Sequence, residues 1–281
     1  MQSFKKLVLA TALVVSFLAT GFLSNAQKFI TPPVMSASWS EDYPPFRIAG
    51  NLYYVGTHDL ACYLITTPKG NILINTGLAE SAAMIKKHIE MLGFKFSDTK
   101  ILLATHAHYD HVAAMAEIKK ETGATLMINE KDAHVMIDGG NSDYSFGGKG
   151  PTFQGVKPDV LLHGQTKVKL GGMNIETIPL PGHTQGAYGY LFDVKDEHRT
   201  YKVFIANLPS ILSTTKFPTM ATYPNVAKDY GYTFDVLKKM HFDIWLASHA
   251  GQFNLEKKHK PGDAYNTEAF MNDQKGYDAA V

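Results

Sequence analysis

The chain has 281 residues, a formal net charge of +1 and a single cysteine. The near-neutral charge gives no reason to expect a nucleic acid or an acidic partner, and one cysteine excludes an internal disulfide. Hydrophobic residues make up 45% of the chain, which is enough for one large domain or two small ones. Stability therefore has to come from the core and from any bound metal.

The first residues are typical of an exported protein. Lys5 and Lys6 precede a long apolar run, and Ala26 closes a small-x-small cleavage pattern. We therefore expect a signal peptide at residues 1–26, one domain at residues 27–281, and a periplasmic protein with no stable membrane anchor. An uncleaved anchor is the alternative that the length of the apolar run leaves open.

In the first half of the chain, short apolar runs between turn residues predict strands, and apolar residues at helical spacing predict helices. The expected strands are residues 52–56, 61–66, 72–75, 101–104 and 124–128, and the expected helices are residues 81–92, 112–122 and 131–137. His88 lies on the apolar face of the first of these helices, where a packed core residue is more common than a metal ligand.

A glycine-rich loop from Gly139 to Gly155 follows and contains Tyr144, Phe146 and Phe153. It is longer than most connections, which favours a functional loop over a plain linker. Its glycines lack phosphate-loop spacing and predict no nucleotide site. The three aromatic side chains either form an apolar wall over a bound ligand or pack against the body of the protein.

The second half repeats the pattern of strands followed by helices. The expected strands are residues 167–170, 174–179, 188–193 and 201–206, and the expected helices are residues 225–239 and 264–274. Two such halves predict an α/β fold in which two sheets pack face to face with helices outside.

The stretch from Thr105 to His111 holds a dense cluster of metal-ligand types. His106, His108, Asp110 and His111 stand within six residues, and imidazole with carboxylate is a ligand set that suits zinc. The cluster follows a predicted buried strand, at the end of which α/β sheets form their binding crevices. His106 and His108 project to one side of an extended loop, while the other two lie at the turn into a helix. One loop can thus serve two neighbouring metals.

Two further histidines also stand at predicted strand ends. His183 lies in the turn after residues 174–179, and His249 follows the apolar run at residues 244–247. Each alone is more often a surface or core residue than a ligand, but three strand-end loops that all present histidine favour a shared site. Seven histidines have no comparable setting: His58, His88, His134, His163, His198, His241 and His259.

With these residues, the chain resembles the metallo-β-lactamase superfamily. The His-x-His-x-Asp-His signature at 106–111 is followed in that family's order by Gly182-His183-Thr184 and Ser248-His249. The stretches most similar to the subclass B3 lactamases, and to the GOB-type branch in particular, are residues 46–56, 70–77, 205–210 and 242–245. The resemblance covers nearly all of the chain after the signal peptide, and it implies an αββα sandwich with two mixed sheets.

The resemblance also implies two zinc ions per chain, with His106, His108 and His183 on one and Asp110, His111 and His249 on the other. GOB-type enzymes commonly have Gln in place of His106, so the complete histidine set here supports occupancy of both sites. The superfamily often has Asp where this chain has Asn75, which can orient a neighbour by a hydrogen bond but adds no charge.

The activity implied by the resemblance is hydrolysis of the β-lactam amide of penicillins, cephalosporins and carbapenems by a metal-bound hydroxide, which confers antibiotic resistance. Asp110 is the implied catalytic residue, as a charged ligand, and a separate general-base role for it stays open. Ser210 matches the position that hydrogen-bonds the substrate carboxylate, although a turn serine equally often caps its own backbone. Thr184 either braces the site or has an ordinary turn role. Leu208, where subclass B3 often has Ser, contributes only packing.

Two other functions remain open: an exported zinc hydrolase for a thioester, lactone or ester, and a zinc-binding protein that keeps its ligands only for stability. Glyoxalase II and the lactonases of this superfamily take a bridging Asp from the region that is Tyr201 to Ser210 here. That region contains no Asp, Glu or Cys, which favours the lactamase. Di-iron members have Glu in place of His108, which argues against redox iron.

Overall fold

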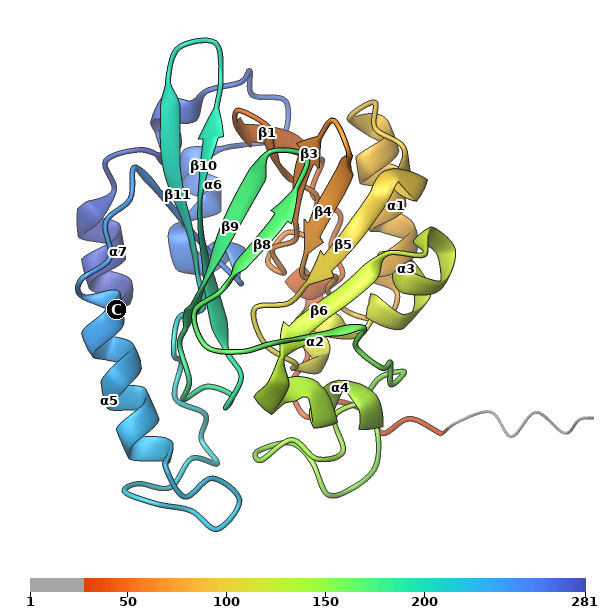
Figure 1. Cartoon of the computed structure of the whole chain (residues 1–281), viewed down its shortest axis with the longest axis vertical. Helices are drawn as coiled ribbons and strands as arrows, with labels where there is room; N and C mark the ends of the chain where they lie inside the picture. The colour runs from red at the N-terminus through yellow and green to blue at the C-terminus, as the bar shows by residue number, and fades with distance from the viewer. Residues whose placement is uncertain (1–27) are drawn as a thin grey trace, which may run out of the picture.

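Two β-sheets lie face to face at the centre of the computed structural model, which describes residues 28–281 (Figure 1). The seven strands of the first sheet follow chain order: β1 (Phe46–Ala49), β2 (Leu52–Tyr54), β3 (Tyr63–Thr67), β4 (Gly70–Ile74), β5 (Thr99–Leu103), β6 (Thr125–Asn129) and β7 (Val160–Leu162). The five strands of the second sheet run in the order β12 (Ile244–Ala247), β11 (Thr200–Ala206), β10 (Tyr188–Lys195), β9 (Met173–Pro179) and β8 (Lys167–Leu170). The signal peptide predicted at residues 1–26 lies outside the described residues.

Both sheets are mixed. Strands β1 to β4 pair antiparallel, whereas β4 to β7 pair parallel. In the second sheet β8 to β11 pair antiparallel, and β12 is parallel to β11. The antiparallel pair β3–β4 needs only a two-residue turn, while a parallel neighbour requires a crossover. Helix α1 (Ser81–Met91) provides that crossover between β4 and β5.

Helices cover the outer faces of both sheets. On the first sheet these are α1, α2 (Tyr109–Val112), α3 (Met115–Thr122) and α4 (Ala133–Asp138); on the second they are α5 (Val226–Leu237), α6 (Leu255–Lys258) and α7 (Gln274–Ala280). In Figure 1, α1 and α3 lie outside the first sheet, and α5 and α7 lie outside the second. The predicted sandwich is therefore confirmed. Among residues 28–281, no helix is both long and apolar enough to cross a membrane.

Alternation along the strands divides the core into two layers. In β5, Ile101 and Leu103 face the second sheet, while Leu102 packs under the helices. Each such side chain, once fully buried, contributes about 1.5–3 kcal/mol to folding. This double burial fixes the register of β5, since a one-residue slip would exchange its two faces, and so it fixes where the loop after β5 emerges.

Three local predictions were wrong or incomplete. The helix expected at residues 112–122 begins only at Met115, as α3, and a separate short helix, α2, precedes it and ends at Val112. The helix expected at 264–274 is a short 3-10 turn at Thr267–Phe270, and α7 begins only after it. Asn272 has a φ of 57°, which interrupts any helix, and Asp273 then caps α7 by accepting a hydrogen bond from Gly276 N. Strands β1 and β7 were not predicted.

Candidate metal centre

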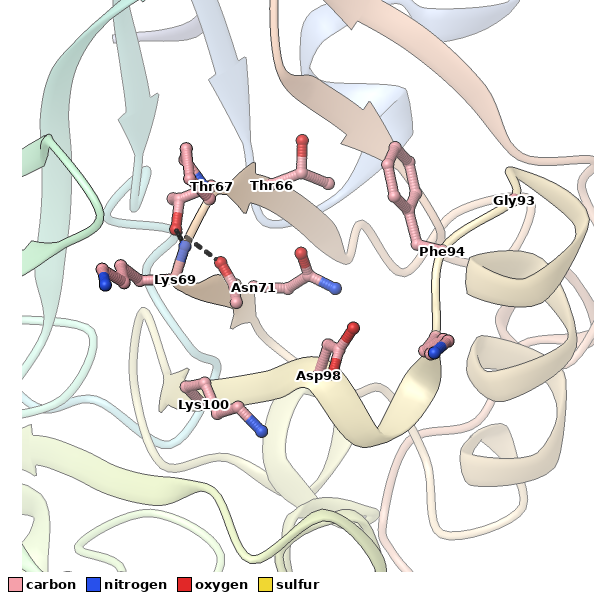
Figure 2. A pocket seen from close by; sticks show the side chains of 11 residues that line it. Thr66, Thr67, Lys69, Asn71, Gly93, Phe94, Asp98 and Lys100 are labelled. Atoms are coloured by element: carbon pink, nitrogen blue, oxygen red, sulfur yellow. Dashed lines mark hydrogen bonds between the residues drawn. The ribbon is translucent and has the colours of Figure 1, made fainter.

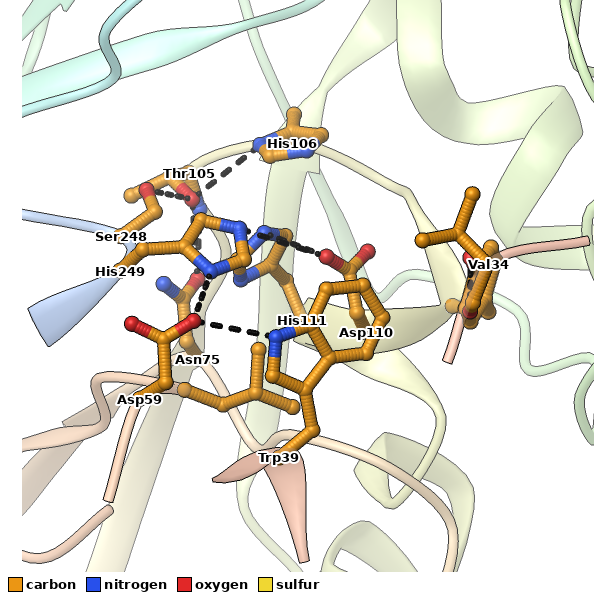
Figure 3. Close-up of polar contacts among 12 residues, drawn as sticks. Val34, Trp39, Asp59, Asn75, Thr105, His106, Asp110, His111, Ser248 and His249 are labelled. Carbon is orange, nitrogen blue, oxygen red and sulfur yellow. Dashed lines mark hydrogen bonds and ion pairs between the residues drawn. The ribbon is translucent and has the colours of Figure 1, made fainter. Parts of the chain in front are cut away.

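The six predicted ligands gather at one end of the sandwich, because three strands end there. The loop after β5 carries four of them, the turn after β9 carries His183, and the loop after β12 carries His249. Figure 3 shows residues from the β5 and β12 loops facing one another. The structure thus brings predicted ligands from both sheets together at one end of the sandwich.

Three histidines form a triangle. The ring centroids of His106, His108 and His183 are 4.7 Å apart in each of the three pairs. One nitrogen from each ring lies within 4.8 Å of the others, and all three residues are buried. Three imidazoles around one point, with room for a fourth ligand, match the coordination of a catalytic zinc ion.

Asp110 is the centre of a second group. Its carboxylate oxygen Oδ2 lies 3.2 Å from His111 Nε2 and 3.4 Å from His249 Nε2. His106, Asp110 and His111 also offer ligand atoms within 4.8 Å of one another. The predicted second set therefore lies together, directly beside the first.

Two buried nitrogen atoms of the cluster lack hydrogen-bond partners within residues 28–281, which supports a cation site independently of the spacing of the residues. His106 Nε2 and His111 Nδ1 are buried and have no hydrogen-bond partner among the described residues. A buried polar atom without a partner costs about 1–3 kcal/mol, so native proteins rarely leave one. A metal ion bound to His106 Nε2 would remove that cost for His106. The donor set of imidazoles with one carboxylate suits zinc.

Two of the rings are held from behind. His183 donates from Nδ1 to the carbonyl oxygen of Ser210 over 2.8 Å, and His249 donates from Nδ1 to Asp59 Oδ2 over 3.0 Å. Trp39 donates to the same Asp59 oxygen over 3.0 Å (Figure 3). Such bonds fix the tautomer and leave Nε2 of each ring free for a metal. Asp59 and Trp39 were not singled out in the sequence.

Burial and neighbouring side chains together set the protonation of the cluster. Burial lowers the pKa of His106 well below its usual value, and with the nearby His108 it lowers the pKa of His183 to about 3. Burial alone would raise the pKa of Asp110, but His111 and His249 hold it well below its usual range. At neutral pH His106 and His183 are therefore neutral and Asp110 is a carboxylate, which are the forms that bind cations. Burial also acts to lower the pKa of His249, but Asp110 and Asp59 raise it to about 9, so a cation has to displace a proton from that ring.

Asp132 ties two ligand loops together. Its carboxylate is buried and accepts hydrogen bonds from Ala107 N over 3.0 Å, Thr184 Oγ1 over 2.8 Å and Gly186 N over 2.7 Å. Ala107 lies between two predicted ligands, and Thr184 follows His183. The hydroxyl of Thr184 thus braces the site, and Asp132 is a supporting residue that the sequence did not reveal.

Asn75 supports the start of the β5 loop rather than a ligand. Its backbone has a φ of 62°, a region in which Asn is enriched. Its Oδ1 accepts from Thr105 N over 2.9 Å, and Ser248 Oγ donates to Thr105 Oγ1 over 2.9 Å. The neutral amide therefore links the ends of β4 and β5 within the first sheet, and Ser248 links Thr105 to the end of β12 in the second.

A cavity of about 160 Å³ opens onto the cluster. Of the three loop aromatics, Phe146 lines it, with its ring centroid 5.0 Å from that of His108. Phe153 is 1% exposed and belongs to the core, and the ring of Tyr144 packs 5.1 Å from that of Tyr223. Tyr144 and Phe153 therefore pack against the body of the protein, whereas Phe146 lies in the position that a wall over a bound ligand requires. Ser210 and Leu208 also line the cavity.

A larger cavity of about 690 Å³ lies elsewhere, between the β3–β4 turn and residues 93–100 (Figure 2). Lysines Lys69, Lys95 and Lys100 line it, and its lining includes no histidine. Cavity size therefore does not identify the site in this fold; the ligand chemistry does.

Comparisons with known proteins agree with this geometry. Residues 56–194 match the family model described as the metallo-beta-lactamase superfamily. Among solved structures, a beta-lactamase from Chitinophaga pinensis is 60% identical, with a TM-score of 0.88 over 90% of this chain and 95% of that one. The class B3 di-zinc metallo-beta-lactamase LRA-12 from an Alaskan soil metagenome is 58% identical, with a TM-score of 0.87 over 89% and 94%. GOB-18 from Elizabethkingia meningoseptica is 51% identical, with a TM-score of 0.88 over 91% and 94%.

Curated relatives match over a shorter stretch. Hydroxyacylglutathione hydrolase GloC from Haemophilus influenzae is 33% identical over 132 residues, which are 46% of this chain and 59% of that protein. The near-complete matches are those to the lactamases. As the sequence predicted, the chain belongs to the metallo-β-lactamase superfamily and, within it, to subclass B3 beside the GOB-type enzymes.

Proposed function

We propose that this protein is a zinc-dependent β-lactamase that hydrolyses the amide bond of penicillins, cephalosporins and carbapenems and so confers resistance to them. The observation that supports it most is the triangle of buried histidines next to Asp110, in a chain 58% identical to a di-zinc class B3 enzyme over nearly its full length. The expected reaction is direct hydrolysis without a covalent acyl-enzyme.

Six residues hold two zinc ions in this proposal, with His106, His108 and His183 on the first and Asp110, His111 and His249 on the second. Zinc, when bound, activates water at neutral pH and polarises a carbonyl group. Asp110 contributes the one negative charge of the ligand set, and its depressed pKa keeps that charge at neutral pH. Phe146 gives the cavity an apolar wall beside His108.

Ser210 is the proposed contact for the carboxylate of the drug. Its side chain is exposed and lines the cavity beside His183, whose Nδ1 is 3.2 Å from Ser210 Oγ. Replacing Ser210 by Ala should raise KM for carboxylate-bearing drugs more than it lowers kcat. Ser213→Ala is the matched control, because Ser213 is exposed in the same segment and is not part of the cavity lining. An unchanged KM in S210A would remove Ser210 from the substrate site.

The resemblance to hydroxyacylglutathione hydrolase keeps a thioesterase as the second candidate. Enzymes of that kind need a bridging carboxylate at the end of β11, where this chain has Asn207. Asn207 lines the cavity, and its buried Nδ2 has no hydrogen-bond partner among the described residues. An amide cannot supply the charge of a bridging carboxylate, which favours the lactamase.

One experiment separates these functions. Rates of penicillin and carbapenem hydrolysis are compared with those for a thioester and a lactone under one set of conditions, and all are repeated after chelation. We expect the β-lactam rates to be the highest and to fall to background on chelation, then to return with zinc. Rates that survive chelation would refute the metal mechanism, and a faster thioester rate would favour the second candidate.

Export to the periplasm fits this activity, because the enzyme must meet the drug before the drug reaches the cell wall. We propose that residues 1–26 are removed and that residues 27–281 form the working domain. Fractionation of expressing cells, with N-terminal sequencing of the periplasmic protein, should give a chain that begins near Gln27.

A further inference from the structure

Asp143 lies in the glycine-rich loop, 35 residues from His108 in sequence but in contact with it in space. Its side chain is 4% exposed, and its Oδ2 is 3.1 Å from His108 Nε2. The other oxygen, Oδ1, accepts from Ser145 N over 2.8 Å and from Phe146 N over 2.6 Å. One buried carboxylate thus joins a predicted zinc ligand to the backbone of the loop beside it.

These contacts determine which nitrogen of His108 is available. A carboxylate can only accept, so the bond to Asp143 places the ring proton on Nε2 and leaves the lone pair on Nδ1. His183 and His249 have the opposite arrangement, because each is held at Nδ1. His108 is therefore the member of the triangle that a carboxylate holds at Nε2, whereas a backbone carbonyl holds His183 at Nδ1.

We propose that Asp143 is a positioning residue that holds His108 in the tautomer that binds metal through Nδ1, and that it couples the 143–146 turn to the three-histidine site. The proposal rests on the assignment of His108 as a zinc ligand under the proposed function. The coupling has a direct structural basis: the turn that Asp143 closes also carries Phe146, whose ring packs 5.0 Å from His108 and 5.9 Å from Tyr109.

The competing explanation is that Asp143 only closes its turn, as Asp commonly does two residues before a backbone N–H. Asp143→Asn separates the two explanations. The Oδ1 of Asn still accepts from Ser145 N and Phe146 N, so the turn is kept. Its Nδ2, however, presents N–H groups to His108 Nε2, which drives the ring proton onto Nδ1 and blocks the ligand atom.

The first test measures metal affinity instead of turnover. Zinc or cobalt is titrated into the metal-free full-length protein in competition with a chromophoric chelator. We expect D143N to bind the ion of the three-histidine site about 10- to 100-fold more weakly, which is the usual effect of removing a partner of a ligating histidine. Asp159→Asn is the matched control, because Asp159 is a half-exposed carboxylate that caps Leu126 N away from the site.

The second test measures the tautomer of His108 directly. Nitrogen-15 spectra of the metal-free wild-type protein, recorded at a pH high enough that the His108 ring carries one proton, should give that proton on Nε2. The same spectra of D143N should give the proton on Nδ1, while hydrogen exchange at Ser145 and Phe146 N–H stays slow. A turn-closing role alone would not change the tautomer.

The outcomes are distinct. Wild-type His108 with its proton on Nδ1, or D143N with wild-type affinity for the first ion, would overturn the role of Asp143 and leave the zinc enzyme in place. Wild-type protein that binds no metal would instead overturn the proposed function on which the inference rests.

Discussion

At the scale of single residues, buried carboxylates that are not ligands decide how the ligands are placed. Asp132 is 1% exposed and receives three hydrogen bonds from the loops that carry His106, His108 and His183. Gly186 belongs to this contact, because a Cβ at that position would lie 2.6 Å from the Asp132 carboxylate. The two loops are therefore packed onto one acidic group with no space for a larger side chain.

Asp132→Asn should weaken this connection. An amide accepts on one side only, so at least one of the N–H or O–H donors is left unpaired in a buried position. We expect the free energy of unfolding to fall by about 1–3 kcal/mol, with weaker zinc binding in the same variant. Urea unfolding with a chelator titration measures both effects, and D159N is the surface control. Wild-type stability in D132N would mean that the loops hold each other without the carboxylate.

Asp196 is a buried carboxylate outside the proposed metal centre whose contribution to stability depends on pH. It accepts hydrogen bonds from His198 N, Arg199 N, Tyr201 OH and Tyr265 OH. Burial alone would raise its pKa, but these donors hold the pKa well below the usual value. A group with a lowered folded-state pKa stabilises the fold above its unfolded pKa of about 3.9, and the stabilisation is lost as the pH falls through the folded value.

Asp196→Asn should therefore be less stable than the wild type at pH 7. The difference in unfolding free energy should shrink below about pH 4, where the wild-type carboxylate begins to lose its advantage. Urea unfolding of both proteins at several pH values measures this trend. A difference that stays constant down to the lowest pH would assign the effect to lost packing instead of charge.

At the scale of elements, the sequence predicts those features that are determined by residues close together along the chain. The strand-end position of the 106–111 cluster follows from an apolar run and a signature that are both local. Asp59 and Asp143 could not be predicted as partners of His249 and His108, because those contacts span 190 and 35 residues. Strand β7 was missed because its apolar run is only three residues long, as edge strands often are, and shows no alternation in the sequence.

The turn from β9 to His183 is an element whose geometry can be tested. Gly182 has a φ of 139°, and a Cβ there would lie 3.0 to 3.2 Å from ring atoms of Tyr230. Gly182→Ala should cost about 1–3 kcal/mol for the backbone conformation and displace His183, so that zinc binds more weakly. Gly172→Ala is the matched control, since Gly172 has a φ of 97° in the β8–β9 turn with no atom within 4 Å of its Cβ.

Both variants should lose stability in thermal unfolding, whereas only G182A should lose zinc affinity in chelator competition. Equal zinc affinity in the two variants would show that the contact with Tyr230 does not position His183.

At the scale of the whole molecule, the proposed metal centre joins the two sheets. The first sheet supplies the ligands of the β5 loop, and the second supplies His183 and His249. Hydrogen bonds cross between the sheets at the same end, from Tyr63 OH to Ala247 O and from Tyr190 OH to Ala104 O, each over 2.6 Å. Since one cysteine excludes an internal disulfide, bound metal adds a link between the sheets beyond these hydrogen bonds and the apolar core.

Removal of zinc should therefore destabilise the entire fold and not only stop catalysis. An ion at 100 times its dissociation constant stabilises the folded state by about 2.7 kcal/mol, which corresponds to about 5–11 °C in Tm for a domain of this size. Scanning calorimetry with and without a chelator measures the shift for the wild type and for a His183→Ala, His249→Ala double variant. The double variant lacks the ligands from the second sheet, so the chelator should change its Tm by much less. If the wild type also melts at the same temperature with and without the chelator, the two sheets are held by their apolar core alone, and the ions contribute only to the chemistry.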